Sequence, residues 1–125
     1  MVFVTGGSWQ GKREWANKTF PKLTNIVDGE TAEFSDFVQA QRIDRLHLWI
    51  RRKMKEGGSL DGYVDRLLQQ NPDVVILMDE VGSGVVPVDK EERAYREKVG
   101  RIGCEIAEKA QSVYRVICGI GTEIK

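Results

Sequence analysis

The chain has 125 residues, of which 41% are hydrophobic and 30% charged, and its 19 basic side chains balance 19 acidic ones. This length and apolar content predict one folded domain over residues 1–125 and argue against a disordered chain. The balanced charge argues against nucleic acids and anionic membranes as partners, because both attract strongly basic surfaces.

Strands and helices are expected to alternate from the N-terminus. The β-branched and aromatic run Val2–Thr5 predicts a strand that ends at a pair of glycines. From Lys12 the apolar residues are spaced for one helical face, and Pro21 ends that helix. The next apolar run, Leu23–Val27, predicts a second strand.

The middle of the chain has helical spacing. Ser35 can cap a long helix whose apolar positions recur as far as Met54. A second helix is predicted over Leu60–Gln70. The continuous apolar run Val74–Met78 is typical of a parallel strand that is covered on both faces, so we expect it at the centre of the sheet.

The last third of the chain predicts a helix, a strand and a tail. Asp89 and Glu92 have the spacing of a capping box and open a helix that continues to about Gln111. The run Val113–Cys118 predicts the last strand, and Gly119–Lys125 is expected to be a glycine-bearing tail. Alternating strands and helices predict an α/β fold, a three-layer sandwich with a mostly parallel sheet.

Targeting signals and cysteine patterns are weak. The purely apolar runs are far shorter than the ~20 residues that span a bilayer, so no membrane span is expected. The start Met1–Gly7 has neither a basic leader nor a cleavage site, which predicts a cytoplasmic protein. Cys104 and Cys118 lack CxxC spacing, so we expect buried, reduced thiols rather than a disulfide or a metal centre.

A glycine-rich segment between the first strand and the first helix carries the strongest chemical signal. It fits the pattern GxxxxGK in the strand–loop–helix context that this motif requires. Such a loop binds phosphate through backbone amides and the helix N-terminus, while Lys12 reaches the outer phosphates of a triphosphate. The alternative is an ordinary tight turn with an incidental lysine. The predicted phosphate-binding residues are Gly6, Gly7, Ser8, Trp9, Gln10, Gly11, Lys12 and Arg13.

Acidic side chains follow two of the predicted strands. Arg13 stands where the motif places the Ser or Thr that binds Mg²⁺, so the metal would be held by water, by Ser8 or by carboxylates from other strands. Asp28 and Asp79 are the candidate metal ligands, and Glu80 is a candidate catalytic residue, because ligands gather beyond the carboxyl ends of parallel strands. The alternative is that these residues cap turns.

Several segments of the chain together resemble one known family. They are Thr5-Gly6-Gly7, Asp79 to Pro87, Tyr95-Arg96-Glu97, Gly100-Arg101, Val113-Tyr114, Gly119-Ile120 and Ile124-Lys125. The block Glu-Val-Gly-x-Gly-Val-Val-Pro within the second of these is the most specific. The chain resembles a short, divergent member of the bifunctional adenosylcobinamide kinase and adenosylcobinamide-phosphate guanylyltransferase family.

This resemblance implies a P-loop NTPase-like fold and a role in cobalamin biosynthesis. Members phosphorylate the aminopropanol hydroxyl of adenosylcobinamide with ATP or GTP and then transfer GMP from GTP through a guanylylated histidine. The resemblance therefore implies a nucleotide, Mg²⁺ and a corrinoid as ligands, with Lys12 stabilising the transferred phosphoryl group. Relatives assemble as trimers, which implies a homo-oligomer.

The family's histidine lies in an Arg-Ile-x-His segment. Here Arg42 and Ile43 are followed by Asp44 and Arg45, and the single histidine, His47, comes two residues later. One interpretation makes His47 a displaced GMP acceptor with arginines nearby. The other makes it a helical histidine that packs or faces water.

Two functions stay open from the sequence. One is a kinase of cobalamin biosynthesis, with or without GMP transfer, and the other is a catalytically degenerate nucleotide-binding module or regulatory subunit. Trp9 in the glycine loop either stacks on a base or corrin edge or packs beside the loop.

Overall fold

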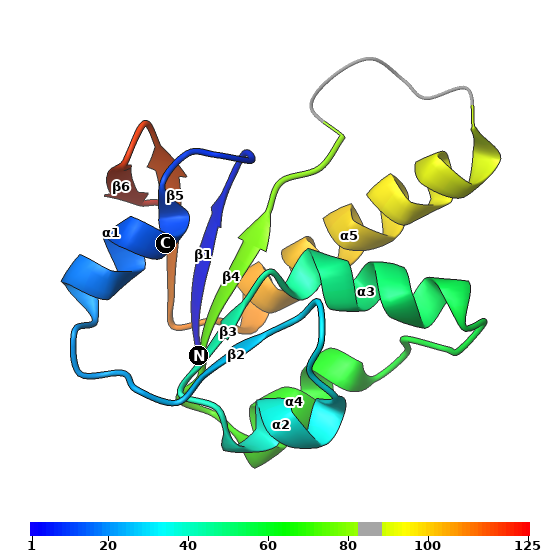
Figure 1. Ribbon diagram of the computed structural model, residues 1–125, viewed down its shortest axis with the longest axis horizontal. Coiled ribbons are helices and arrows are strands. Elements are labelled where there is room, and N and C mark those ends of the chain that lie inside the picture. Colours follow the sequence, from blue (N-terminus) through cyan, green and yellow to red (C-terminus); the bar gives the residue numbers. More distant parts are fainter. Residues whose placement is uncertain (83–88) are drawn as a thin grey trace.

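The computed structural model describes residues 1–82 and 89–125 (Figure 1). The part of the family-like block from Ser83 to Pro87 lies outside the described residues. In chain order the elements are β1 (Val2–Gly6), α1 (Lys12–Thr19), β2 (Ile26–Asp28), α2 (Phe34–Gln39), β3 (Arg42–Asp44), α3 (Leu46–Lys55), α4 (Tyr63–Gln70), β4 (Val75–Asp79), α5 (Lys90–Lys109), β5 (Ser112–Ile117) and β6 (Ile120–Glu123).

The strands form one sheet in the order β2-β3-β4-β1-β5-β6. The first five strands of this order pair in parallel, and β6 pairs antiparallel with β5. Strand β4 lies between β3 and β1, as its continuous apolar sequence predicted, and its first four residues are buried. The predicted α/β fold with a mostly parallel sheet is confirmed.

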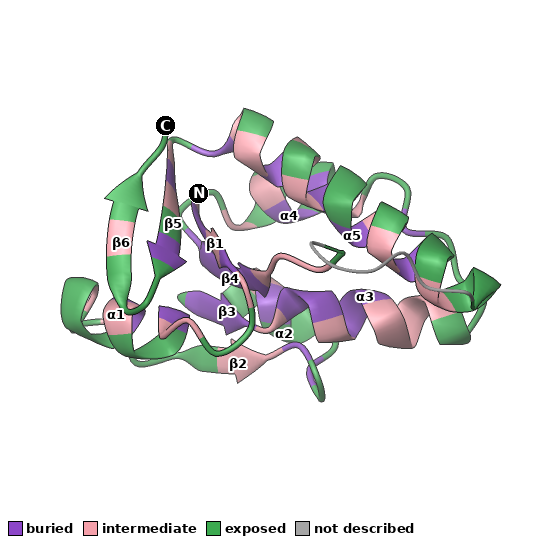
Figure 2. Cartoon of the chain, turned by 90° about the horizontal axis from the view of Figure 1, so that it is seen from above, coloured by how far each residue is buried: buried purple, intermediate pink, exposed green. Residues whose placement is uncertain are grey.

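Helices cover both faces of the sheet (Figures 1 and 2). One face packs Phe3, Ile76 and Met78 against the larger core that α2, α3, α4 and α5 supply. The opposite face packs Val4 and Leu77 into a smaller cluster with residues of α1. This is the predicted three-layer arrangement, and α1 is the helix of its thinner layer.

The predicted long helix from Ser35 to Met54 is wrong. Two short helices, α2 and α3, are separated by strand β3, which pairs with both β2 and β4. Ile43 is completely buried, as the periodicity suggested, but it is buried as a strand residue within the sheet. A strand of three residues is too short to show a period of two, so its apolar residue fell into the helical spacing of its neighbours.

The C-terminal tail is also different from its prediction, because it forms strand β6. Cys118 and Gly119 both have positive φ angles, of 52° and 77°, and connect β5 to β6 as a two-residue hairpin turn. Cys118 and Cys104 are exposed, so the prediction of buried thiols was wrong. The second strand was predicted over Leu23–Val27 and begins later, at Ile26.

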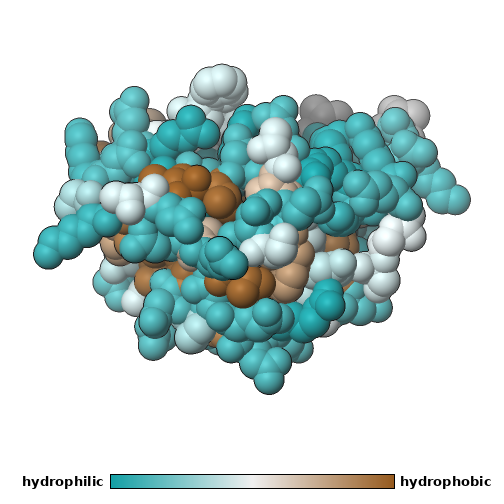
Figure 3. Space-filling view, turned by 60° about the horizontal axis from the view of Figure 1, so that its bottom comes forward, coloured by the Kyte–Doolittle hydropathy of each residue, from teal (hydrophilic) through white to brown (hydrophobic). Residues whose placement is uncertain are grey.

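One face of the molecule is largely polar. Figure 3 shows one face on which hydrophilic side chains predominate and apolar side chains gather in a few separate patches. Within residues 1–82 and 89–125, none of the helices combines the length and apolar character needed to cross a membrane.

Candidate functional site

A cavity of about 680 Å³ opens where β1, β3 and β4 end. It is lined by residues 8–14 after β1, by Asp44, Arg45, His47 and Leu48 around the end of β3, and by Leu77 and Asp79 of β4. A parallel sheet brings the carboxyl ends of its strands to one edge, which is where such folds bind ligands. The volume lies within the range of small-molecule sites.

Two glycines give the loop after β1 its shape. Gly6 has a φ of 149°, and a Cβ there would lie 2.4 Å from the carbonyl oxygen of Val116. Gly11, at the N-cap of α1, has a φ of 89°. Side chains strain such backbone, so the glycines allow the chain to turn tightly between the end of β1 and the start of α1. The loop therefore brings the first turn of α1 to the edge of the cavity.

Lys12 is the buried cation of the loop, with a side chain only 9% exposed. Its Nζ donates to the carbonyl oxygens of Gly6 at 3.1 Å and Gly7 at 2.7 Å, and it lies 2.7 Å from Oδ1 of Asp79. An ammonium has three protons to donate, so these contacts use all of them. Lys12 is held beside the cavity rather than extended into solvent.

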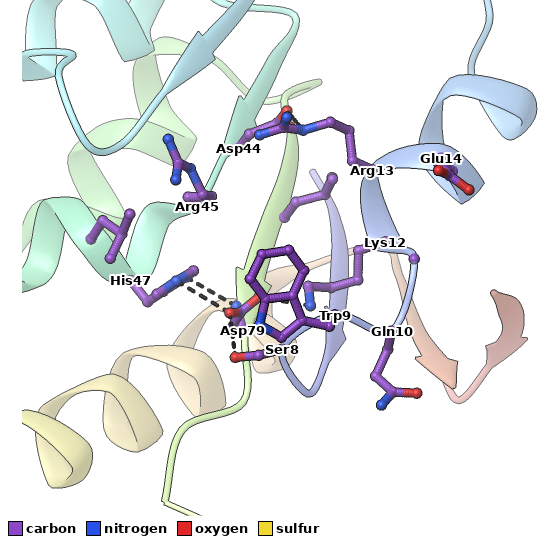
Figure 4. Close-up of a pocket in the computed structure, with 13 residues that line it drawn as sticks. Ser8, Trp9, Gln10, Lys12, Arg13, Glu14, Asp44, Arg45, His47 and Asp79 are labelled. Atoms are coloured by element: carbon purple, nitrogen blue, oxygen red, sulfur yellow. Dashed lines mark hydrogen bonds and ion pairs between the residues drawn. The ribbon is translucent and has the colours of Figure 1, made fainter. Parts of the chain in front are cut away.

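Asp79 connects the loop to His47 (Figure 4). Its second carboxylate oxygen, Oδ2, accepts a 2.9 Å hydrogen bond from the Ser8 hydroxyl and lies 3.4 Å from Nε2 of His47. The backbone N–H of Asp79 donates to Nδ1 of His47 at 3.1 Å. Because Nδ1 is an acceptor here, the neutral imidazole carries its proton on Nε2, the nitrogen nearer the carboxylate.

Burial favours the uncharged form of both groups. Burial and the nearby cations Lys12, Arg45 and Arg51 lower the pKa of His47 below its ordinary value, although the Asp79 carboxylate opposes that shift. Burial alone would raise the pKa of Asp79, but the hydrogen bond from Lys12, the charge of His47 and the hydrogen bond from Ser8 lower it. Near neutral pH the pair therefore consists of an ionised carboxylate and an uncharged imidazole.

Gln10 has a structural role within the loop. Its side-chain oxygen accepts a 2.8 Å hydrogen bond from the N–H of Cys118, and its carbonyl oxygen accepts one of 2.7 Å from Gly119. These contacts attach the glycine loop to the turn between β5 and β6. In Figure 4 the side chain of Gln10 points away from the group around Asp79.

Trp9 is the most exposed residue of the loop. Its side chain is 100% exposed and its backbone adopts a φ of 62°. The alternative in which this ring packs beside the loop is therefore wrong. The indole stands at the cavity, among the lining residues, with its faces open to solvent.

A second polar cluster at the end of β3 was not predicted. Arg42 and Asp44 are buried, and Nε and Nη2 of the arginine donate to the two carboxylate oxygens at 2.7 and 2.9 Å. Arg42 also donates to the side chain of Asn17 on α1, and Arg13 lies 3.4 Å from Asp44. The sequence signal was the alternating Arg-x-Asp pattern, which a helical interpretation of this segment concealed.

Asp28 lies beside the site but does not line the cavity. Arg45 donates to both of its carboxylate oxygens and also contacts Glu30 at 2.7 Å. Burial would raise the pKa of Asp28, but its hydrogen bonds with Arg45 and the backbone of Glu30 lower it. Arg45 has a φ of 53°, a strained backbone for a residue with a side chain, at the N-cap of α3.

Glu80 also lies outside the residues that line the cavity. Its carboxylate accepts hydrogen bonds of 2.9 and 3.0 Å from Arg115 of β5, and its backbone N–H donates to the carbonyl of Gly6. The structure thus brings Lys12, His47 and Asp79 together at one cavity. It leaves two of the predicted site residues, Glu80 and Asp28, beside it.

The donor set at the cavity does not fit a magnesium ion held by protein side chains. Over the described parts of the chain, no three His, Cys, Asp or Glu side chains converge into a metal site built from protein ligands alone. The carboxylate of Asp79 forms an ion pair with Lys12, and that of Asp44 forms an ion pair with Arg42. The motif's hydroxyl position is occupied by Arg13, which supplies a positive charge and no ligand oxygen.

Comparison with known proteins gives a family and two partial relatives. A family model described as cobinamide kinase / cobinamide phosphate guanyltransferase matches residues 27–124. The bifunctional adenosylcobalamin biosynthesis proteins CobU of Escherichia coli strain K12 and Salmonella typhimurium strain LT2 are each 40% identical over 52 residues. This covers 42% of the chain and 29% of each relative, so the similarity spans under a third of the relatives' length. The glycine loop precedes the matched range.

Proposed function

Because the chain belongs to the cobinamide kinase and cobinamide phosphate guanyltransferase family, as its resemblance predicted, we propose that it binds ATP or GTP at the glycine loop and phosphorylates adenosylcobinamide. The mostly parallel sheet with helices on both faces is consistent with the P-loop NTPase-like fold expected of this family. The corrinoid substrate, a homo-oligomeric state and a cytoplasmic location belong to the same proposal.

The observation that carries this proposal is the position of Lys12. Its ammonium lies between the carbonyls of the glycine loop and Asp79, at the start of a helix whose first amides have no intrahelical acceptors. A helix N-terminus and a lysine that meet at one loop form an anion site. A triphosphate would compete with Asp79 for the protons of Lys12.

In phosphoryl transfer, the protein contributes mainly by positioning the reactants and by stabilising the charge of the transition state. The hydroxyl oxygen of the acceptor forms a bond to the terminal phosphorus of the nucleotide, and the bond from that phosphorus to the bridging oxygen breaks. The nucleoside diphosphate leaves with the bridging oxygen's negative charge, which Lys12 would stabilise. Asp79 is an ionised carboxylate that lines the cavity and would accept the hydroxyl proton.

A second candidate activity, GMP transfer, rests on the position of His47. Its Nε2, which lies 3.4 Å from Asp79, would attack the α-phosphorus of GTP and displace pyrophosphate only as the tautomer that carries its proton on Nδ1, because a ring nitrogen that bears a proton has no free lone pair. That tautomer requires the hydrogen bond from the Asp79 N–H to Nδ1 to break when GTP binds. His47 lines the same cavity as Lys12. Acid-labile labelling by α-labelled GTP, present in the wild type and absent in His47→Ala, would support this role. A wild type that takes up no label would exclude it.

The kinase proposal is tested by transfer of γ-label from ATP or GTP to adenosylcobinamide. We expect transfer by the wild type and a loss of about a hundredfold or more in Lys12→Ala, because the charge on the leaving phosphate loses its cation. Lys18→Ala is the matched control, since Lys18 lies exposed on the same helix. Turnover that is unchanged in Lys12→Ala would contradict the role of the loop. Nucleotide binding without transfer would favour the alternative of a binding module.

A further inference from the structure

Arg13 lies on the first turn of α1, directly after Lys12, and lines the same cavity. Its side chain is 60% exposed, whereas that of its partner Asp44 is only 6% exposed. The Nε of Arg13 lies 3.4 Å from Oδ2 of Asp44, and Figure 4 shows the arginine side chain directed toward this carboxylate. The guanidinium is therefore oriented by a buried anion at the edge of the cavity.

Asp44 itself is well suited to orient an arginine and poorly suited to bind a metal. Both of its oxygens accept hydrogen bonds from the buried Arg42, at 2.7 and 2.9 Å. A carboxylate that already forms a bidentate pair has little capacity left for a divalent ion, which would have to displace a buried cation. Arg13 contacts Asp44 through Nε alone, and a guanidinium has further N–H donors on its terminal nitrogens. These terminal donors can therefore bind a ligand in the cavity.

We propose that Arg13 takes the place of the divalent cation at this site, so that the phosphates of a nucleotide bind without Mg²⁺. The inference rests on the proposed nucleotide site and identifies which side chain neutralises the negative charge of the phosphates there. A guanidinium bonds two phosphate oxygens at once, which a lysine ammonium cannot do with the same geometry. Arg13 and Lys12 then contribute two fixed positive charges on consecutive residues.

The test is calorimetric titration of the full chain with ATP and with inorganic triphosphate. Each titration is run with excess Mg²⁺ and with excess EDTA at matched ionic strength. For the wild type we expect the dissociation constant of each ligand in Mg²⁺ and that of the same ligand in EDTA to agree within about threefold. For Arg13→Ser we expect binding in EDTA to weaken by about tenfold or more, with Mg²⁺ restoring part of the loss through the new hydroxyl. Lys18→Ser is the matched control and should bind as the wild type does.

The outcomes separate this inference from the proposed function. Wild-type binding that requires Mg²⁺ would overturn the role of Arg13 and leave the nucleotide site intact. Binding in EDTA that is equally tight in Arg13→Ser would also overturn it. Absence of binding under every condition would overturn the proposed function and this inference together. Arg13→Ser should still fold, because Asp44 keeps its pair with Arg42, and a thermal melt checks this.

Discussion

The loop after β1 and the turn after β3 both lead from a parallel strand into a helix at the same cavity, yet they are built differently. The first depends on glycines and backbone geometry, and Lys12 donates to the carbonyl oxygens of Gly6 and Gly7 in the same segment. The second follows a strand that carries a buried pair of charged side chains, Arg42 and Asp44. The loop provides groups that suit an anion, and the turn provides the charges that orient them.

This difference predicts different responses to substitution. Arg42 and Asp44 of β3 neutralise one another inside the protein, so removing Arg42 leaves a buried charge without its bidentate partner. Residues of the glycine loop face the cavity, so substitutions there change binding, unless they introduce a side chain where the backbone allows none.

The largest effect is expected at the buried pair. Arg42→Met should lower the free energy of unfolding by about 3–5 kcal/mol, because Asp44 loses its bidentate partner while it stays buried. Urea unfolding followed by circular dichroism measures this. The double variant Arg42→Met/Asp44→Leu removes both charges and should recover most of the loss. A single variant as stable as the wild type would show that the end of β3 does not depend on this pair.

The glycine loop should be most sensitive at Gly6. Gly6→Ala should cost about 2–4 kcal/mol, because its Cβ would lie 2.4 Å from the Val116 carbonyl and its φ is 149°. Gly57→Ala is the matched control, since Gly57 also has a positive φ but a Cβ added there would meet no atom within 4 Å. We expect a cost of about 1 kcal/mol there. Equal costs in the two variants would argue against close packing at Gly6.

His47 should make the stability of the site dependent on pH. Burial lowers its pKa in the folded protein, so its contribution is complete above the ordinary value of 6.5. As the pH falls below 6.5, the unfolded chain binds a proton that the folded chain does not, and the free energy of unfolding decreases. His47→Asn keeps an acceptor for the N–H of Asp79 and should flatten this slope in melts between about pH 7 and 5. An unchanged slope would assign the titration to another group.

The smallest effect is expected at Asp79. Asp79→Asn removes a negative charge and a competitor for Lys12, so inorganic triphosphate should bind about fivefold more tightly, roughly 1 kcal/mol. Calorimetry measures the affinity, and Asp28→Asn, outside the cavity lining, is the control. Phosphoryl transfer by Asp79→Asn should fall although binding improves, if Asp79 accepts the hydroxyl proton. Weaker triphosphate binding would show that Asp79 helps the loop to hold its anion.

Much of the fold and part of the site could be predicted from the sequence. The run Val74–Met78 predicted a central strand because a strand covered on both faces needs apolar residues throughout. Lys12 and the glycines were found because the phosphate-binding pattern is local in sequence. His47 was named as a candidate, and the structure places it at the cavity beside Asp79.

Strand β3 could not be predicted, because its three residues form a strand only by pairing with β2 on one side and β4 on the other. The same pairing brings Asp44 to the cavity, where Arg42 and Arg13 reach it. Glu80 was a reasonable candidate at the end of β4, but Arg115 from β5 binds its carboxylate outside the cavity lining. The contacts of Asp44 with Arg13 and of Glu80 with Arg115 depend on which residues, far apart in the sequence, the fold brings close together.

The sequence by itself determined the α/β class, the central strand and the glycine loop with Lys12, because each depends on residues that are neighbours along the chain. The tertiary structure alone decided which carboxylates Lys12 and Arg13 contact, and so how charge is arranged around the cavity. The pairs Lys12–Asp79 and Arg13–Asp44 join residues that the paired strands bring together from distant positions, whereas Arg42 and Asp44 are close in sequence. The free energy of a buried pair depends on desolvation and geometry that no local pattern records.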